Sequence, residues 1–585
     1  MRRTKILATI GPACNEIEIM KQMIKRGMDA ARINFSHATH ESCLDTINKL
    51  KAARAELNKP VALVLDTKGP EIRIGAFEND KVYLEQGAEF TITTEDIIGD
   101  VTRVSVTYQN LARDLQIGSR VLIDDGLIEM KVIAKNDKEI KCVLINSGFL
   151  GNRKGVNIPD VYVDLPSLTE KDIADIKFGI EHGFDYVAAS FVRTALDVTN
   201  IRKVLDENGG RHMKIIAKIE SRDGVDNIDS ILQVADGVMV ARGDLGVEIP
   251  PEEVPIVQKM LIRSCNLMGK PVITATHMLE SMVSNPRPTR AEANDVANAV
   301  YDGTDVVMLS GETAYGQWPL EAISMMVRIA EQVEGTIDYG SEVNERYRNL
   351  NKNITNAISN AAVATAADLG ATCIVSITDS GFAARMVSRS RPACPVLAIT
   401  ADDVTYRQLN LIWGCTPLLS DKPFEGDSEI FDIAENKALE SGLANNGDII
   451  VAIAGVPVGA AGTTNTIKVR TVGNVLAKGV GNNLGEVRGI TRVFTPDTVE
   501  ERVFFERGDI IICTNTDDTI LEYIKKAGAL VIGSWEKQDY SHAETVAKTL
   551  DIPMLRLDVR PVDFVKTGIA VTIDTNEGLL LNGYK

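Results

Sequence analysis

The segments MKIIAKIESRDGV (213–225) and GVMVARGDLGVEIPPE (237–252) contain the pattern that decides the fold. Each is an apolar run of strand length that ends abruptly in charge, so Lys218, Glu220 and Asp244 fall where strands give way to loops. A lysine with two carboxylates is typical of a divalent-metal site for phosphate chemistry, because Mg²⁺ uses one or two carboxylates plus substrate oxygens. For any one of these residues alone, an ordinary salt bridge on a solvated rim is the better interpretation.

Apolar runs of the same kind recur from the N-terminus, with amphipathic segments between them. They are KILATIGP (5–12), AARINFSH (30–37), VALVLDTKGPE (61–71), DYVAASF (185–191), KIIAKIES (214–221), GVMVARGDLG (237–246), PVITATHM (271–278) and VVMLSGE (306–312). Eight such runs predict eight parallel strands buried on both faces, which is the α/β architecture of a (β/α)₈ TIM barrel. Polar residues crowd the carboxyl end of nearly every run, where such barrels carry their active sites.

Composition narrows the function classes. A chain of 585 residues is too long for one core and predicts several domains. The formal net charge of −18 argues against nucleic acid or an anionic membrane as a partner. The eight cysteines form no CxxC pair, which predicts reduced thiols, and no run reaches the ~18 apolar residues of a membrane helix. We therefore expect a cytoplasmic protein.

A phosphate ligand would need local positive charge in so acidic a chain. The candidate cations are Arg32, Arg73, Lys154, Lys218 and Arg242.

Residues 71–164 differ in character from the barrel runs. They contain β-rich patches broken by Gly, Asn and Asp turns at hairpin spacing, which predicts a small inserted β-barrel. Over a catalytic face it would be a lid that excludes water, and the alternative is a passive insertion. Arg73 and Lys154 near its two ends favour the lid. The expected catalytic barrel is therefore 1–70 with 165–340.

Two further α/β domains are expected, at 341–475 and 476–585. In the first, two loops could form an anion site for a phosphorylated effector. An ordinary helix cap and an ordinary glycine turn explain the same residues equally well. These loops contain Thr378, Ser380, Gly381, Thr463 and Thr464. In the second, His542 begins a helical pattern, where it could carry a phosphoryl group or, more commonly, be a solvated or capping residue.

Taken together, the motifs resemble the pyruvate kinase family, in particular the bacterial form with an extra C-terminal domain. The matching segments are TKILATIGPAC (4–14), AARINFSHATH (30–40), LVLDTKGPEIRIG (63–75), GNRKGVNIPDV (151–161), AKIESRDGVDN (217–227), VMVARGDLGVEIP (238–250), VITATHMLESM (272–282), NPRPTRAEANDVANAVYDGTDVVMLSGETA (285–314) and GVPVGAAGTTN (455–465). The resemblance implies phosphoryl transfer from phosphoenolpyruvate to ADP by a homotetramer. The final domain resembles the swivelling phosphohistidine domain of enzymes that use phosphoenolpyruvate.

The resemblance also implies roles for individual residues. Glu220 and Asp244 would hold Mg²⁺ or Mn²⁺, and Lys218 with Arg32 would bind the transferring phosphoryl group. Thr276 would belong to the relay that protonates the enolate. The substrate carboxylate would meet the backbone at Ala241, Arg242, Gly243 and Asp244.

Further residues match the family's K⁺ and nucleotide positions. The implied K⁺ ligands are Asn34, Ser36, Asp66 and Thr67, and the implied nucleotide contacts are Asn34, His37, Arg73 and Lys154. Glu71 strengthens the expectation of K⁺ dependence, because relatives that dispense with K⁺ usually carry a lysine at this position.

Several residues depart from the family pattern. His277 and Asn294 replace the usual glutamine and serine near the catalytic rim, and Phe382 with Ala383 alters the effector loop. Residues Gln538, Asp539 and Tyr540 replace the glycines and threonine that usually precede the histidine. A structural or regulatory role for His542 is therefore favoured over phosphorylation.

Two other function classes remain open. A barrel lyase or aldolase would use the same Mg²⁺ to stabilise a pyruvate enolate, but it leaves Lys218, the K⁺ set and the inserted domain without a role. A catalytically retired effector-binding or scaffold protein would be expected to have lost charged residues of the site, and none is lost.

Overall fold

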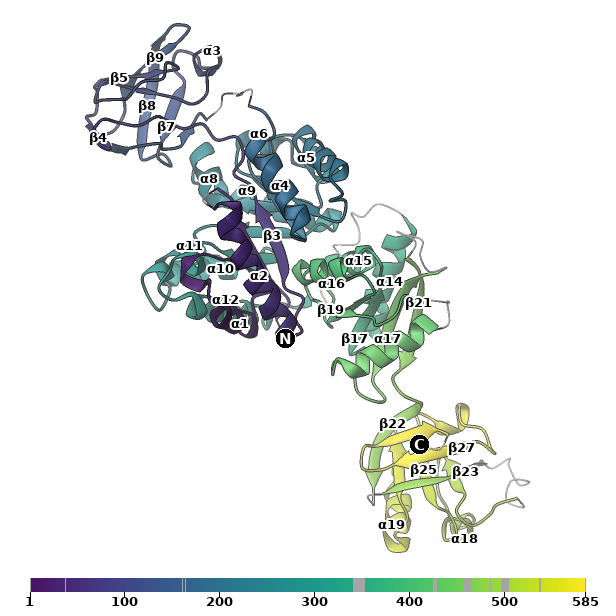
Figure 1. Ribbon diagram of the computed structural model, residues 1–585. Helices are drawn as coiled ribbons and strands as arrows, with labels where there is room; N and C mark the ends of the chain where they lie inside the picture. Colours follow the sequence, from purple (N-terminus) through teal and green to yellow (C-terminus); the bar gives the residue numbers. More distant parts are fainter. Residues whose placement is uncertain are drawn as a thin grey trace. The chain divides into compact units, whose positions relative to one another are not determined.

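The computed structural model describes residues 2–36, 38–159, 161, 163, 165–339, 353–424, 429–456, 464–483, 485–495, 504–535 and 538–583 (Figure 1). The chain divides into two compact units. The first is Met1–Asn360 with Thr378–Pro423, and the second is Ala361–Ile377 with Phe424–Lys585. No helix in the described part of the chain is both long and apolar enough to cross a membrane.

A closed parallel barrel forms the centre of the first unit, with strand order β1-β16-β15-β14-β13-β12-β3-β2. Its strands are β1 (Lys5–Thr9), β2 (Ala30–Asn34), β3 (Ala62–Asp66), β12 (Tyr186–Ala189), β13 (Lys214–Ile219), β14 (Gly237–Ala241), β15 (Val272–Ala275) and β16 (Val306–Leu309). Each of the eight predicted runs supplies one strand, so the expected TIM barrel is confirmed. Successive residues alternate between two cores: Ile6 and Ala8 pack outward against helices, whereas Leu7 fills the barrel interior.

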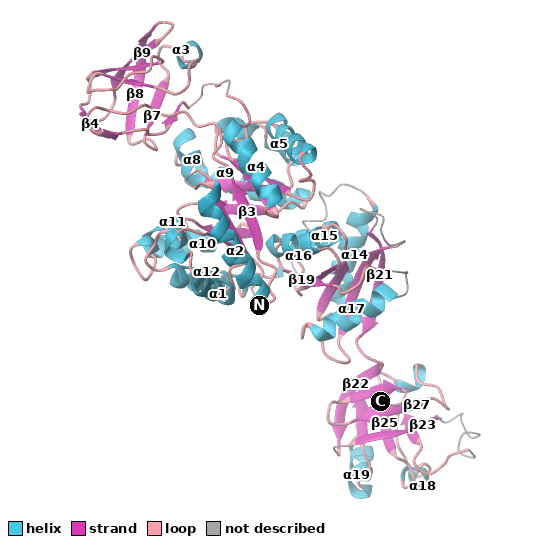
Figure 2. Ribbon diagram, in the orientation of Figure 1, coloured by secondary structure: helices cyan, strands magenta, loops and turns pink. Residues whose placement is uncertain are grey.

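Helices surround these strands, as the cyan ribbons around the magenta barrel show (Figure 2). The longer ones are α1 (Ile17–Lys25), α2 (His40–Glu56), α4 (Glu170–Glu181), α5 (Ala195–Glu207), α7 (Ile228–Val234), α9 (Val254–Met268), α10 (Arg290–Tyr301) and α12 (Pro319–Glu334). Shorter helices follow strand ends: η1 (Pro12–Cys14), α6 (Arg222–Asp226), α8 (Arg242–Glu248), η2 (Glu280–Val283) and α11 (Gly311–Ala314). Capping boxes headed by Thr39, Thr169 and Thr289 satisfy free N–H groups and fix where α2, α4 and α10 begin.

The inserted segment between β3 and β12 has a core of its own, which includes Phe90, Leu111 and Ile128. Its elements are β4 (Lys81–Leu84), β5 (Glu89–Thr93), β6 (Arg103–Ser105), α3 (Leu111–Asp114), β7 (Arg120–Ile123), β8 (Ile128–Lys135), β9 (Glu139–Leu144), β10 (Gly148–Gly151) and β11 (Val156–Asn157). They form a six-stranded sheet and a two-stranded sheet in place of the single small barrel that was expected. The reason is that β4 pairs only with β10 among the described strands.

Residues 378–423 of the first unit pack against the start of the barrel strands. They contain α15 (Phe382–Arg389), β18 (Val396–Thr400), α16 (Asp403–Gln408), η3 (Leu409–Leu411) and β19 (Cys415–Leu419), with β18 and β19 parallel. Arg407 Nε donates to the buried Asp185 Oδ1 over 2.9 Å, and Arg391 Nη2 lies 3.0 Å from Asp305 Oδ1. These ion pairs lie at the end of the barrel opposite its catalytic rim.

Helix α14 (Ile354–Asp368) leads the chain into the second unit. There β17 (Cys373–Ile377) pairs in parallel with β20 (Ile449–Gly455), which pairs antiparallel with β21 (Thr464–Thr471), and α17 (Glu429–Glu440) packs on them. A second closed barrel follows, built from β22 (Val475–Asn482), β23 (Glu486–Phe494), β24 (Ile510–Cys513), β25 (Ala529–Gly533), β26 (Met554–Leu557), β27 (Ala570–Asp574) and β28 (Leu579–Asn582). Its helices are α18 (Leu521–Ile524), α19 (Ser541–Leu550) and η5 (Pro561–Asp563).

Candidate active site

A buried cluster of charges lies at the carboxyl ends of β2, β3 and β13. Lys218 Nζ lies 2.9 Å from Glu220 Oε1 and 3.1 Å from Asp66 Oδ1, and it donates to Ser190 Oγ over 2.8 Å. Arg32 Nε donates to Asp66 Oδ2 over 2.5 Å. Because neighbouring parallel strands end at one rim, residues far apart in sequence share a single network. The structure thus brings Lys218 and Glu220 together, as the sequence predicted.

The cluster fixes the protonation states of Asp66 and Lys218. Burial alone would raise the pKa of Asp66, but Arg32 and Lys218 outweigh it, so the pKa lies below its ordinary value. Burial likewise opposes the charge of Lys218, yet Asp66 and Glu220 raise its pKa above the ordinary value. Lys218 therefore keeps its positive charge at neutral pH.

Glu220 is held by the backbone as well as by Lys218. It follows β13 directly, is 1% exposed, and its Oε2 accepts from Phe191 N over 2.6 Å. Phe191 has a positive φ of 54°, a strained conformation for a bulky residue. Burial raises the pKa of Glu220 to about 7, against the effect of Lys218. Its carboxylate is thus short of positive partners.

Asp244 stands in the first turn of α8, after the end of β14, and is exposed at a cavity wall. The protein around its carboxylate raises the pKa by desolvation despite the opposing charge of Lys218, and Asp125, Asp66 and Glu71 raise it further. Asp244 also raises the pKa of Glu220, so the two proposed metal ligands influence each other.

The Arg242 side chain is engaged within the protein. Its Nε donates to Ala275 O over 3.1 Å, its Nη2 to Thr276 O over 2.6 Å, and its Nη1 to Asp295 Oδ1 over 2.7 Å. The guanidinium therefore braces the ends of β14 and β15. The phosphate contact suggested by the positive charge of Arg242 stays a prediction.

Thr276 follows β15 in a strained backbone. Thr276 and His277 have φ values of 72° and 55°, in the region that favours glycine. Gly243 packs against this turn so closely that an added Cβ would lie 2.9 Å from Thr276 Cγ2. Thr276 is half-buried, whereas His277 is exposed. Together Gly243 and Thr276 bring the loops after β14 and β15 into contact.

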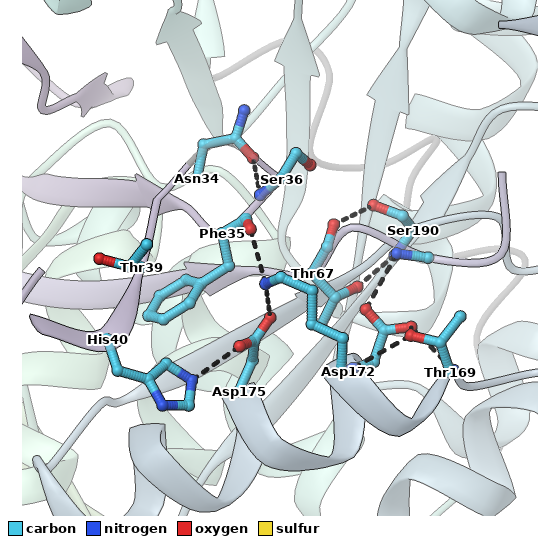
Figure 3. A network of polar contacts seen from close by, with 12 residues as sticks. Asn34, Phe35, Ser36, Thr39, His40, Thr67, Thr169, Asp172, Asp175 and Ser190 are labelled. Carbon is cyan, nitrogen blue, oxygen red and sulfur yellow. Dashed lines mark hydrogen bonds and ion pairs between the residues drawn. The ribbon is translucent and has the colours of Figure 1, made fainter. Parts of the chain in front are cut away.

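The four predicted K⁺ ligands lie at the ends of two paired strands, β2 and β3, where Asn34 is the register partner of Asp66. Asn34 Oδ1 accepts from Ser36 N over 3.0 Å, which closes a tight turn after β2 (Figure 3). Thr67 Oγ1 accepts from Ser190 N over 3.1 Å. These residues therefore form two adjoining loops rich in oxygen atoms.

A cavity of about 450 Å³ opens between the rim of the barrel and the inserted domain. Asp244, Arg193 and Asp223 line it from the barrel side, and Asp125, Val156 and Asn157 line it from the inserted side. Near it, Arg73 Nε donates to Glu71 Oε2 over 2.8 Å and Lys154 Nζ lies 2.9 Å from Asp124 Oδ1. The two predicted nucleotide-contacting cations are thus already paired with acids.

Other predicted residues fall outside this site. Gly381 caps α15 with a φ of 74°, beside the buried Thr378 and the exposed Ser380. Thr464 begins β21 and is buried. His37 and Thr463 lie outside the described residues. In the C-terminal barrel, His542 lies in the first turn of α19.

Neither Ser190 nor Arg193 was predicted from the sequence as a site residue. Ser190 Oγ donates to Thr67 O over 2.7 Å, so it joins Lys218 to the loop after β3. Arg193 donates to Val163 O and Leu165 O, over 2.8 Å and 2.7 Å, and so holds the link that returns from the inserted segment. The available signal was their place at the end of the fourth apolar run and just after it, where polar residues mark the rim of such barrels.

The donor set agrees with Mg²⁺ or Mn²⁺. Within the described ranges no group of three or more His, Cys, Asp or Glu residues is arranged to enclose a metal ion. Two carboxylates whose pKa values are both raised fit an ion that completes its shell with water and substrate oxygens, as Mg²⁺ does. An all-protein cage is therefore not required here.

Family models match two stretches of the chain. One described as pyruvate kinase, barrel domain, matches residues 1–323, and one described as pyruvate kinase, alpha/beta domain, matches residues 356–470. The chain is 45% identical to a pyruvate kinase of Sporosarcina psychrophila and 44% identical to one of Geobacillus stearothermophilus, in each case over 100% of this chain and 99% of the relative.

A solved structure gives the same result in three dimensions. The crystal structure of a pyruvate kinase from Cryptosporidium parvum is similar with a TM-score of 0.77 and 40% identity. It covers 80% of this chain and 96% of that chain. The bacterial relatives match the whole chain, including the C-terminal barrel that follows the family-model matches.

Proposed function

The chain belongs to the pyruvate kinase family, and from this membership we propose how its own residues perform the reaction. The enzyme transfers the phosphoryl group of phosphoenolpyruvate to ADP and yields ATP and pyruvate. The observation that carries the proposal is the buried cluster of Lys218, Glu220, Asp66 and Arg32 beside the cavity that Asp244 lines.

We assign the transferring phosphoryl group to Lys218 and Arg32. Both cations are fixed by Asp66 before substrate arrives, so little reorganisation is needed when negative charge redistributes in the transition state. Ser190 supplies Lys218 with a neutral acceptor. The fixed ammonium can therefore stabilise the phosphoryl group throughout its transfer.

Glu220 and Asp244 would hold the divalent cation, Mg²⁺ or Mn²⁺. When bound, such a cation neutralises phosphate charge and polarises the oxygens that it binds. Both carboxylates have raised pKa values because the protein desolvates them and acidic neighbours lie close by, and a nearby positive charge relieves that cost. Residues 241–244 would present backbone N–H groups to the substrate carboxylate.

Thr276 would take part in delivering a proton to the enolate that remains after phosphoryl transfer. Its strained turn packs against Gly243, which keeps its hydroxyl close to the loop that receives the carboxylate. Such strain is commonly retained at functional positions because the surrounding structure enforces it. His277 is exposed beside it.

K⁺ would be bound by oxygens of Asn34, Ser36, Asp66 and Thr67, and the nucleotide would occupy the cavity near Arg73 and Lys154. To meet a nucleotide phosphate, Arg73 and Lys154 would have to leave Glu71 and Asp124, their acidic partners. The inserted domain would serve as a lid over this cavity. His37, which lies outside the described residues, would also contact the nucleotide.

The remaining assignments follow from the family. We propose a cytoplasmic homotetramer with domains at 1–70 with 165–340, 71–164, 341–475 and 476–585. Residues 378–381 with 463 and 464 would bind a phosphorylated effector.

The C-terminal barrel would be a phosphohistidine-like domain in which His542 has a structural or regulatory role. Thr516 Oγ1 lies 2.8 Å from His542 Nδ1, so a threonine distant in sequence supports the ring. Detection of a phosphohistidine at His542 after incubation with phosphoenolpyruvate would contradict this role and assign phosphoryl transfer to the domain.

A pyruvate-formation assay with and without ADP tests the proposal against its alternatives. ADP-dependent pyruvate formation is expected, whereas ADP-independent cleavage of a carbon–carbon bond would indicate a lyase, and inactivity would indicate a scaffold. Lys218→Met should lower kcat by about 10²–10³-fold, the usual cost of losing a transition-state charge contact. The surface variant Lys177→Met is the matched control, because Lys177 is exposed on α4.

The monovalent-cation assignment has a test of its own. The wild-type enzyme should lose most of its activity when Na⁺ or Tris replaces K⁺ at constant ionic strength. Full activity without K⁺ would remove the role assigned to Asn34, Ser36, Asp66 and Thr67.

A further inference from the structure

The first turn of α4 contacts both loops that carry the proposed K⁺ ligands. Lys171 and Asp172 are the second and third residues of this helix. Lys171 Nζ donates to Phe35 O over 2.8 Å, in the loop after β2. Asp172 Oδ1 accepts from Gly69 N over 3.0 Å, in the loop after β3. Two consecutive side chains therefore tie the two loops to one rigid element.

The Lys171 contact orients one peptide unit between two proposed ligands. Phe35 O accepts from Lys171, and the N–H at the other end of the same planar peptide, Ser36 N, donates to Asn34 Oδ1 over 3.0 Å. Figure 3 shows Phe35 and Ser36 on this turn, above Asp175. With both ends held, the peptide cannot rotate without breaking a hydrogen bond. The oxygens of Asn34 and Ser36 are thereby kept in one arrangement.

Lys171 is itself held by a buried acid. Asp175, one helical turn later, is 1% exposed and accepts from Lys171 Nζ over 2.6 Å and from His40 Nε2 over 2.8 Å. His40 also stacks on Phe178 of α4, with ring centroids 4.5 Å apart. The ammonium that reaches Phe35 is thus fixed from the helix side and is not a freely rotating surface group.

Asp172 fixes the second loop in a comparable way. Asp172 is fully buried. Its Oδ2 accepts from Thr169 N over 2.9 Å and from Thr169 Oγ1 over 2.6 Å, while its Oδ1 accepts from Gly69 N. Gly69 has a φ of 73°, and an added Cβ would lie 2.9 Å from Ser190 Cβ. The carboxylate therefore anchors a turn that starts at Thr67.

We propose that Lys171 and Asp172 are positioning residues for the monovalent cation, because they hold the two ligand-bearing loops at the separation that K⁺ requires. This inference rests on the K⁺ site proposed above. K⁺ binds weakly through neutral and acidic oxygens, so its affinity depends on how well those oxygens are arranged beforehand. Outer partners that orient metal ligands typically contribute 10–100-fold to affinity.

Three variants separate positioning from general stability. Lys171→Met removes the donor to Phe35 and Lys171→Arg keeps a donor. Asp172→Asn leaves one side-chain oxygen in place of two, so it cannot keep the separate hydrogen bonds of Oδ1 with Gly69 N and of Oδ2 with Thr169. Lys177→Met, on the exposed side of the same helix, is the control. Each is titrated with KCl at saturating phosphoenolpyruvate, ADP and Mg²⁺, with tetramethylammonium chloride keeping the ionic strength constant.

Lys171→Met and Asp172→Asn should raise the K⁺ concentration for half-maximal activity by roughly tenfold. This is the lower limit of the effect of residues that orient metal ligands. Their kcat should return towards the wild-type value at high K⁺, and Lys171→Arg and Lys177→Met should match the wild type. In a thermal scan without substrates, K⁺ in place of tetramethylammonium should raise the wild-type midpoint more than that of the two affected variants.

A folded Lys171→Met enzyme with wild-type K⁺ half-saturation and K⁺-induced stabilisation would overturn the inference, as would a kcat loss that no K⁺ concentration restores. Lys171 is partly exposed, with 43% of its side chain accessible, so this variant is expected to fold even if Asp172→Asn does not. Failure of the underlying K⁺ site is recognised separately, because the wild-type enzyme would then be fully active and equally stable without K⁺.

Discussion

Lys218 has two acidic acceptors and one neutral acceptor, the Ser190 hydroxyl. Ser190 also donates to Thr67 O, and its backbone N–H donates to Thr67 Oγ1. A single hydroxyl thus aligns the catalytic ammonium with the loop after β3. We therefore expect Ser190, which has no acid–base chemistry of its own, to position Lys218 for the proposed reaction.

Ser190→Ala should lower kcat by about tenfold, because loss of one buried hydrogen-bonding partner costs roughly 1–3 kcal/mol and 1.4 kcal/mol corresponds to a factor of ten. Ser190→Thr keeps the hydroxyl and should lose less activity. Steady-state kinetics with matched thermal scans check this. An unchanged kcat in a folded Ser190→Ala enzyme would mean that Asp66 and Glu220 alone position Lys218.

Cysteine reactivity follows burial at the residue scale. Burial raises the pKa of Cys142, Cys415 and Cys513 to about 12 and that of Cys14 and Cys43 to about 11, while Cys394 is half-buried. A raised pKa means that almost no thiolate is present at pH 8, and the thiolate is the reactive form.

A thiol reagent at pH 8 should therefore label Cys394 first, with the buried thiols reacting only after denaturation. Mass spectrometry of the labelled peptides gives the order. Cys394→Ser should abolish the fast phase and leave the slow phase intact. Rapid labelling of Cys142 or Cys415 in the native protein would show that these cores open more readily than their burial indicates.

At the scale of elements, the barrel strands could be predicted and the loop geometry could not. Continuous apolar runs are required of strands buried on both faces, so β13 and β14 could be recognised from composition. The positive φ of Thr276 and the bracing role of Arg242 depend on tertiary contacts with Gly243 and Asp295. Local sequence contains no signal for those contacts.

The C-terminal barrel illustrates the same limit. Its buried strands β24 and β25 are continuous apolar runs, the pattern that strands buried on both faces require. β22 and β23 are long, half-exposed and interrupted by Gly479, Gly481 and Gly489, so neither composition nor strict alternation marks them. Glycine is needed at Gly481 because a Cβ there would lie 1.9 Å from Thr575 O. Close packing of backbones, which periodicity does not report, determines these strands.

The link that returns from the inserted domain gives an element-scale prediction. Arg193 holds Val163 O and Leu165 O, so Arg193→Met should loosen this link and accelerate proteolytic cleavage between 158 and 169. Arg202→Met is the matched control, since Arg202 binds Met213 O and Asp236 away from the link. Timed digestion followed by mass spectrometry measures the effect.

If the inserted domain acts as a lid, Arg193→Met should also raise the KM for ADP, because the cavity that it lines would be less well defined. Equal cleavage rates in the two arginine variants would contradict the role of Arg193 as an anchor. Faster cleavage with an unchanged KM for ADP would support the role of Arg193 in holding the link and would argue against a lid function of the inserted domain.

At the scale of the whole molecule, two cations lie together at the proposed phosphate site of a chain that is acidic overall. The chain has a formal net charge of −18, yet Arg32 and Lys218 stand together in the barrel among buried acids. Acidic residues elsewhere favour solubility without competing for a phosphorylated substrate. The charge balance and the (β/α)₈ pattern were both accessible from sequence, whereas the division into two compact units was not, because it depends on long-range contacts.

Heating should resolve the two units. The proposed catalytic residues and the cavity belong to the first unit, and the C-terminal barrel of the second has its own core around Ile512, Leu530 and Leu580. Ligands stabilise only the part that binds them, by about 2.7 kcal/mol at a concentration of one hundred times Kd. Phosphoenolpyruvate with Mg²⁺ and K⁺ should therefore raise the midpoint temperature of one calorimetric transition and leave that of the other unchanged.

A Lys218→Met enzyme should show the same two transitions, but the ligands should shift the midpoint of the first much less. A single transition that moves as a whole with ligand would mean that the units unfold cooperatively.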